Sequence, residues 1–88
     1  MYFVYLLTCA DGSIYTGIAT DVKRRFAEHR KGTASRYTRA KKAVRIIYIE
    51  KHLNRSTASK REVEIKKWPR SAKLALAAKR KTKRRVKV

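Results

Sequence analysis

The sequence feature that most constrains the fold is the pair Asp11-Gly12, which separates two short segments rich in β-branched and aromatic residues. These segments span residues 2–8 and 13–18. Because Asp-Gly favours the tight turns that join neighbouring antiparallel strands, the pattern predicts a β-hairpin. The chain of 88 residues has room for one small domain around this hairpin.

The middle of the chain predicts one helix, a loop and a further strand. Thr20 or Asp21 can cap a helix over residues 22–31, which Gly32 closes. Residues 33–43 are polar and basic without clear periodicity, so we expect a loop there. Residues 44–50 carry apolar side chains on both faces, which predicts a third strand in the centre of the sheet.

Two more helices are expected in the last third of the chain. One starts near Ser56 or Thr57 and runs to Trp68, and the next begins at Pro69 and fades near Lys79. The resulting order β-β-α-β-α-α describes an α+β domain, a small three-stranded antiparallel sheet flanked by helices. We expect this domain to occupy residues 1–78 and residues 79–88 to form a basic, flexible tail.

The charge balance indicates the kind of partner. Lys and Arg number 25 against 6 Asp and Glu, a formal net charge of +19, which favours a polyanion. Residues 79–88 are nearly all cationic, which predicts a phosphate-clamping arm; a solvated end that keeps the protein soluble is the alternative. The single cysteine, Cys9, excludes an internal disulfide and a Cys-based zinc site. No run approaches the ~20 apolar residues of a membrane helix and the start is not a signal peptide, so we expect a cytoplasmic, nucleoid-associated protein.

The first predicted helix carries an unusual face. Val22, Arg25, Phe26 and His29 share one stripe at spacings of three and four, and half of this stripe is polar. Arg25 could reach the helix edge with its charged end, and His29 could be a satisfied, partly buried imidazole. Arg25 and His29 lie together on a face that points toward a hairpin with tyrosines. This combination favours a phosphate-binding site.

The hairpin and the later acidic residues supply further candidates. Tyr5 and Tyr15 are either ordinary strand aromatics or partners across the hairpin, and Gly17 within a strand indicates a bulge or a close backbone approach. Glu62 and Glu64 lie in a helix rich in Lys and Arg. Either could pair with a lysine or hold a hard cation, since Mg²⁺ often takes only one or two protein carboxylates.

These segments together resemble the GIY-YIG nuclease family, in particular its short single-domain bacterial members. The resemblance extends from about Tyr2 to Leu76 and rests on the order and spacing of six segments, residues 3–5, 15–17, 20–29, 35–39, 46–50 and 58–68. It departs from the family motifs where Phe3 replaces Gly, Val4 replaces Ile and Thr16 replaces Ile. Many related nucleases also use a late Asn, whereas the one Asn here, Asn54, precedes the carboxylates.

The resemblance implies a role for each candidate. Tyr5 and Tyr15 would orient or deprotonate the attacking water, in surroundings that lower the pKa of the base. Arg25 would bind the scissile phosphate, and His29 would assist proton movement or orient a tyrosine. Glu62, which matches the family's metal ligand better than Glu64 does, would hold one Mg²⁺ or Mn²⁺ ion.

The leading hypothesis is therefore a metal-dependent endonuclease that hydrolyses phosphodiester bonds in DNA, in repair or in processing of branched or damaged structures. The alternative is a non-catalytic nucleic-acid-binding module with the same fold and basic surface. RNA is the alternative substrate, no membrane partner is expected, and the oligomeric state stays open, with a monomer as the simplest case. The expected nucleic-acid contacts are basic or aromatic: Arg24, Arg36, Tyr37, Arg39, Lys66, Lys67, Lys81, Arg84 and Arg85.

Overall fold

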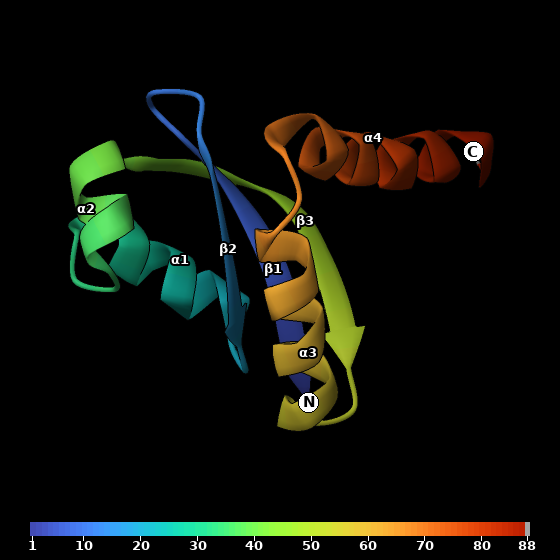
Figure 1. Cartoon of the computed structure of the whole chain (residues 1–88), viewed down its shortest axis with the longest axis horizontal. Coiled ribbons are helices and arrows are strands. Elements are labelled where there is room, and N and C mark those ends of the chain that lie inside the picture. Colours follow the sequence, from blue (N-terminus) through green and yellow to red (C-terminus); the bar gives the residue numbers. More distant parts are fainter. Residues whose placement is uncertain (88) are drawn as a thin grey trace.

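Three antiparallel strands form the single sheet of the computed structural model, which describes residues 1–87 and the side chains of residues 1–79. The strands are β1 (Tyr2–Cys9), β2 (Ile14–Ala19) and β3 (Ala43–His52). The predicted hairpin is confirmed, because β1 and β2 pair antiparallel around the Asp11-Gly12 turn. The sheet and its helices make the α+β architecture expected from the sequence (Figure 1).

The prediction that the third strand is central is wrong, because the strand order is β2-β1-β3. Four consecutive residues of β1 (Val4, Tyr5, Leu6 and Leu7) are almost fully buried, as expected of a strand covered on both faces. β3 lies at an edge, where most of its side chains are only half-buried or exposed. An apolar run identifies a strand well, but its rank in the sheet depends on which strands pair with it.

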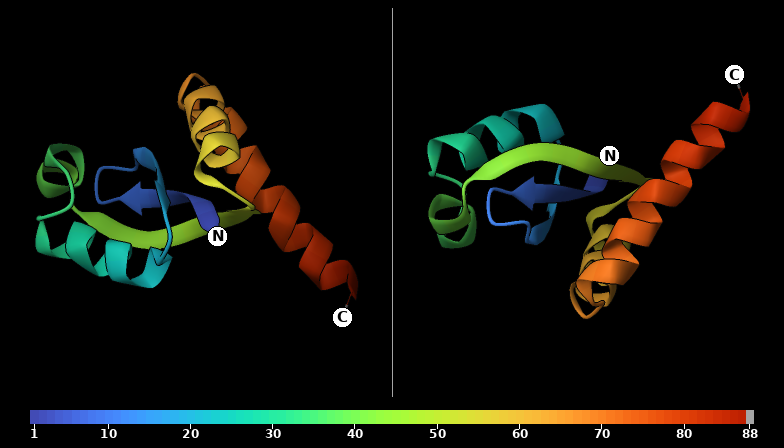
Figure 2. Two further views of the ribbon diagram at one scale, coloured as in Figure 1. Left: turned by 90° about the horizontal axis from the view of Figure 1, so that it is seen from below. Right: turned by 90° about the horizontal axis from the view of Figure 1, so that it is seen from above.

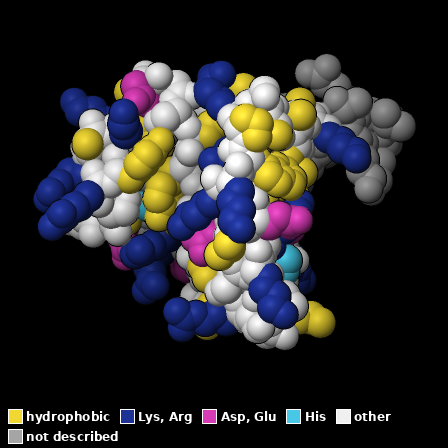
Figure 3. Space-filling view, viewed as in Figure 1, with side chains coloured by type: hydrophobic (Ala, Val, Ile, Leu, Met, Phe, Trp, Pro, Cys, Tyr) yellow, Lys and Arg dark blue, Asp and Glu magenta, His cyan; other side chains and the backbone are white. Residues whose placement is uncertain are grey.

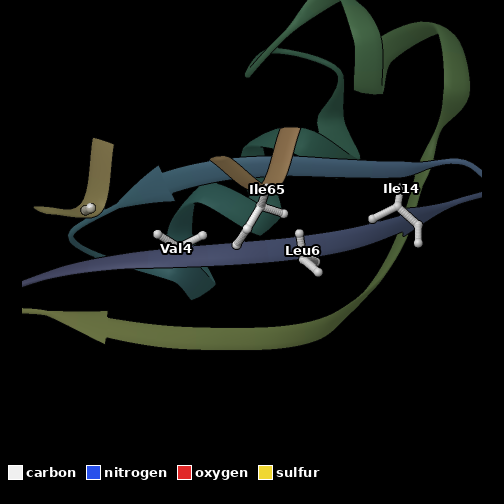
Figure 4. Close-up of a cluster of buried hydrophobic side chains, with 5 residues drawn as sticks. Val4, Leu6, Ile14 and Ile65 are labelled. Carbon is white, nitrogen blue, oxygen red and sulfur yellow. The ribbon is translucent and has the colours of Figure 1, made fainter. Parts of the chain in front are cut away.

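Helices cover both faces of the sheet (Figure 2). On one face, α3 (Arg55–Lys66) buries Ala58 and Ile65 against Val4, Leu6 and Ile14 (Figure 4). On the other face, α1 (Val22–Lys31) packs its apolar stripe against the odd-numbered side chains of β1. Fully burying each large aliphatic side chain contributes about 1.5–3 kcal/mol, so these two small cores hold the sheet between the helices.

The first predicted helix matches the structure at both ends. The side chain of Asp21 accepts a hydrogen bond from the backbone N–H of Arg24, as an N-cap does. Gly32 ends the helix with a φ of 83°, in the left-handed region that glycine tolerates best. The caps therefore fix the start and end of the helix that carries Arg25 and His29.

A short helix, α2 (Arg36–Lys41), occupies the segment predicted to be a loop. Ser35 caps it by accepting a hydrogen bond from the backbone N–H of Thr38. With six residues and little apolar periodicity, α2 leaves no helical pattern in the sequence. Its position is set by packing of Thr38 beneath α1, which local sequence does not reveal.

The last two helices differ from the prediction at their ends. α3 starts at Arg55, because Asn54 and not a later Ser or Thr provides the cap, and it ends at Lys66, before Trp68. α4 (Arg70–Lys87) continues past Lys79, where we expected it to fade. The side chains of Lys81, Arg84 and Arg85 lie outside the described part. Their predicted contacts, and the flexible tail predicted over residues 79–88, therefore stay predictions.

Candidate active site

Gly17 lets the Tyr5 side chain lie across the edge strand β2. The two residues are paired in the β1–β2 register. A Cβ atom at position 17 would stand 2.7 Å from the Tyr5 hydroxyl oxygen and 2.9 Å from Cε2 of Tyr15. Real Cβ atoms do not approach other atoms this closely, so glycine here serves a close approach of side chains to the backbone.

The two tyrosines and one histidine form a compact aromatic group. The Tyr15 ring lies 6.3 Å from the Tyr5 ring and 4.8 Å from the His29 ring, measured between centroids. Tyr15 is paired with Leu7 in the register, so the tyrosines are diagonal neighbours on one face and do not stand directly opposite. The hydroxyl of Tyr5 is hydrogen-bonded to Nε2 of His29 at 2.9 Å.

His29 is buried, with 1% of its surface exposed, and both of its ring nitrogens are hydrogen-bonded. Nε2 contacts the Tyr5 hydroxyl, and Nδ1 contacts the Thr38 hydroxyl at 2.7 Å. The ring is satisfied, as the simpler interpretation of the sequence expected, yet one of its partners is itself a candidate catalytic group. Sequence analysis missed Thr38; the signal that could have found it is Ser35, a residue type that favours helix N-caps and here caps the backbone N–H of Thr38.

Arg25 lies one turn before His29 and remains beside the aromatic group. Its guanidinium is 2.8 Å from a carboxylate oxygen of Glu28 and also contacts the backbone carbonyl of Ala34 at 3.5 Å. Its positive charge and a side-chain interaction with the hydroxyl both act to lower the pKa of Tyr5. With a side chain about two-fifths exposed, Arg25 can contact both the buried hydroxyl and an anion from solution.

Burial decides the protonation states of Tyr5 and His29. It raises the pKa of Tyr5 far above its ordinary value; the neighbouring Tyr15 adds to this and the Arg25 charge opposes it. Burial also lowers the pKa of His29, and the Arg25 charge lowers it further. The expectation that cationic surroundings would lower the pKa of the base is therefore wrong for Tyr5, and both groups are neutral near pH 7.

Glu62 and Glu64, which sequence periodicity separated only weakly, occupy different environments. The Glu62 side chain is 19% exposed, and its negative charge raises the pKa of Tyr5, so it acts on the same hydroxyl as Arg25. The Glu64 side chain is 57% exposed and forms an ion pair with Arg61 at 2.7 Å. Arg61 also donates to Glu50 on β3, so this second group of charges ties α3 to the sheet.

Lys and Arg side chains are spread across the face of the molecule shown in Figure 3. Among the predicted nucleic-acid contacts, Tyr37 is 39% exposed and its ring centroid lies 5.7 Å from that of Tyr15. The remaining contacts with described side chains are all exposed, namely Arg24, Arg36, Arg39, Lys66 and Lys67. Lys66 also forms an ion pair with Glu62 at 3.2 Å. Within the described residues, none of the helices has the length and apolar character needed to span a membrane.

Comparison with known proteins gives results that agree with one another. A family model described as the GIY-YIG catalytic domain matches residues 1–75. UPF0213 proteins from Staphylococcus aureus strains Mu50 and N315 are each 43% identical over 79 residues, covering 90% of this chain and 96% of the relative. The solution NMR structure of a UPF0213 protein from Bacillus halodurans is similar with a TM-score of 0.55 and 37% identity, covering 89% of this chain and 84% of that one.

Proposed function

Because this chain belongs to the GIY-YIG nuclease family, we propose that it is a metal-dependent endonuclease that hydrolyses phosphodiester bonds in DNA. The observation that carries the proposal is the buried 2.9 Å hydrogen bond between the Tyr5 hydroxyl and Nε2 of His29. This bond joins a candidate base to a neutral imidazole that can take up a proton, beside the guanidinium of Arg25.

The chain's own residues can supply both proton transfer and charge stabilisation. Tyr5 is protonated near neutral pH, so it acts as a base only if its own proton leaves as it takes one from water. Nε2 of His29 is close enough to receive that proton. The water oxygen then forms the new P–O bond while the bond to the leaving oxygen breaks, and the leaving oxygen takes a proton from solvent.

Arg25 and Tyr15, which are less buried than Tyr5 and His29, would bind the phosphate and orient the attacking water in this step. Negative charge builds up on the non-bridging phosphate oxygens during hydrolysis, and a guanidinium beside Tyr5 is suited to bind them. Tyr15 is half-buried between the His29 and Tyr37 rings, where its hydroxyl can orient the attacking water.

One Mg²⁺ or Mn²⁺ ion fits the donor chemistry at Glu62. The carboxylate is a hard oxygen donor, and its ion-pair partner Lys66 is about half exposed and free to move aside. No group of three or more His, Cys, Asp and Glu side chains able to hold a metal exists among the described residues. In this proposal Glu62 would hold the ion, with water and phosphate oxygens among the remaining ligands, as Mg²⁺ sites commonly allow. The bound ion would neutralise charge on the phosphate.

We propose DNA as the substrate, in repair or in processing of branched or damaged structures, which would associate the protein with the nucleoid. The support is the net charge of +19, which favours sequence-independent phosphate contacts. A protein that binds DNA in this way without cutting it is the competing function, and RNA is the competing substrate.

The test is a cleavage assay with nicked, flapped and plain duplex DNA and matched RNA, in Mg²⁺ or in EDTA. We expect cleavage of DNA by the wild type and by Glu64→Gln, a matched control on the same helix. Glu62→Gln and EDTA should each abolish cleavage. Binding without cutting by the wild type, or cutting that survives both Glu62→Gln and EDTA, would contradict the proposal.

A further inference from the structure

Thr38 is the buried residue of α2, with 1% of its surface exposed, and its hydroxyl contacts His29 directly. The Thr38 Oγ1 atom lies 2.7 Å from Nδ1 of His29 and 2.9 Å from Oγ of Ser35. It also points a donor toward the backbone carbonyl of Ser35 at 3.5 Å. A threonine placed only to fill space in the core would not need three polar partners.

Ser35 offers an acceptor for the hydrogen of the Thr38 hydroxyl. A hydroxyl has one hydrogen to donate, and the Ser35 carbonyl can only accept. The Ser35 hydroxyl also accepts a hydrogen bond from the Thr38 backbone N–H. When its hydrogen is directed to Ser35, Thr38 Oγ1 presents a lone pair to Nδ1 of His29, so that Nδ1 can be the donor in that contact.

The groups around Tyr5 lead to the same arrangement from the other side of the ring. The Tyr5 hydroxyl is hydrogen-bonded to Nε2 of His29, and the neighbouring Arg25 guanidinium can only donate, so Arg25 offers the Tyr5 hydrogen no acceptor. The Tyr5 hydrogen is then free for Nε2 of His29, which must present a lone pair. One tautomer of His29, with its hydrogen on Nδ1, satisfies both contacts.

We propose that Thr38 is a positioning residue that holds His29 in the tautomer able to take the Tyr5 proton. The tautomer of His29 is inferred from the hydrogen-bond geometry, whereas its effect on cleavage rests on the proposed nuclease function. Without the Thr38 hydroxyl, a neutral His29 gains by placing its hydrogen on Nε2 and donating it to Tyr5. Nε2 then has no lone pair for the Tyr5 proton, and proton transfer stops although every candidate catalytic residue is present.

The direct test is ¹⁵N-detected NMR of the imidazole nitrogens, which reports which one carries the hydrogen and needs no enzymatic activity. At pH 7.5 we expect the hydrogen on Nδ1 of His29 in the wild type and in Thr38→Ser, which keeps the hydroxyl. In Thr38→Val, which has the same shape without it, we expect the hydrogen on Nε2. A His52→Gln background leaves His29 as the only imidazole and makes the assignment unambiguous.

Single-turnover cleavage is the second readout. Thr38→Val should cut about 10- to 100-fold more slowly, the scale seen when residues that orient catalytic groups are removed. Its DNA affinity should stay within about 2-fold, since binding depends on phosphate contacts elsewhere. Thr38→Ser should recover most of the rate.

The outcomes separate this proposal from the proposed function. A hydrogen on Nε2 in the wild type overturns the role of Thr38, as does a Thr38→Val protein whose hydrogen stays on Nδ1. If Thr38→Val does not fold, the wild-type spectrum alone decides. If the tautomer changes as expected but the wild type cuts no nucleic acid, the hydrogen-bond assignment stands and the nuclease function fails.

Discussion

The hydroxyl oxygen of Tyr5 lies 2.7 Å from the point where a Cβ atom of residue 17 would stand. The Tyr5 side chain therefore has room in this position because residue 17 is a glycine. The Tyr5 ring carbon Cζ is equally close, at 2.8 Å. This relationship explains why Gly17 lies within a strand, where glycine has no side chain to pack.

Replacing Gly17 with alanine should push the Tyr5 side chain away from His29. Overpacking of this kind costs about 1–3 kcal/mol, and the displaced hydroxyl no longer reaches Nε2. We expect a lower melting temperature and at least a 10-fold slower cleavage, measured by calorimetry and by single-turnover assay. A variant with unchanged stability and rate would show that the close approach has no functional role.

Thr16 presents an opportunity to stabilise the protein. Its hydroxyl is buried on the α3 face and makes no hydrogen bond within the described residues. A buried hydroxyl without a partner costs about 1–3 kcal/mol, and the family motif has an apolar residue at this position. We expect Thr16→Val to raise the melting temperature by a few degrees, since about 1 kcal/mol corresponds to ~4–8 °C in a domain of this size.

Thr38→Val is the matched control for that substitution. The same hydroxyl is removed, but at Thr38 it is hydrogen-bonded to His29, so the change should lower the melting temperature. A stabilising effect at both positions would mean that hydrogen bonding does not distinguish the two threonines.

His29 should make stability depend on pH below neutrality. Burial lowers its pKa in the folded protein below the ordinary value, which the unfolded chain retains. As pH falls below ~6.5, the unfolded chain takes up a proton that the folded chain resists, so the free energy of unfolding decreases. Above that pH both states are neutral and the contribution is constant.

Urea unfolding at pH 7.5 and pH 5.5 measures this effect. The loss of stability between the two values should be smaller in His29→Gln than in the wild type, because glutamine does not titrate. An equal loss in both proteins would assign the pH dependence to other groups.

The basic end of α4 should affect binding more than cleavage chemistry. Replacing Lys81, Arg84 and Arg85 with glutamine in the full chain removes three positive charges. The affinity for DNA should fall, and the log–log dependence on salt should flatten by ~0.9 for each phosphate that is no longer neutralised. The rate at saturating DNA should change little.

A variant with the same loss of charge at Lys51, Arg55 and Lys60 controls for net charge. These residues are exposed near the junction of β3 and α3 and were not expected to contact nucleic acid. Equal salt slopes in the two triple variants would reduce the role of the α4 end to net charge.

Local interactions account for the parts of the fold that could be predicted from the sequence. The Asp11-Gly12 turn fixes the hairpin, and Asp21 and Gly32 fix the ends of α1 through hydrogen bonds and backbone conformations within a few residues. Helical spacing alone also predicts that Arg25 and His29 share one face of α1. The order of strands and the existence of α2 were not predicted correctly, because they depend on packing against other parts of the chain. The start of α3 was placed too late although its cap is local, because Asn54 was not chosen over the later Ser56 and Thr57.

The sequence by itself determined which chemical groups this protein has and on which elements most of them lie. Only the tertiary structure decided how they act on one another. The Tyr5 side chain passes over Gly17 to reach Nε2 of His29, and Thr38 of α2 contacts Nδ1 of the same imidazole. It also reversed the expected direction of the Tyr5 pKa, because burial outweighs the nearby positive charge. Burial is a property of the whole packed chain, and for that reason no local pattern of residues can specify it.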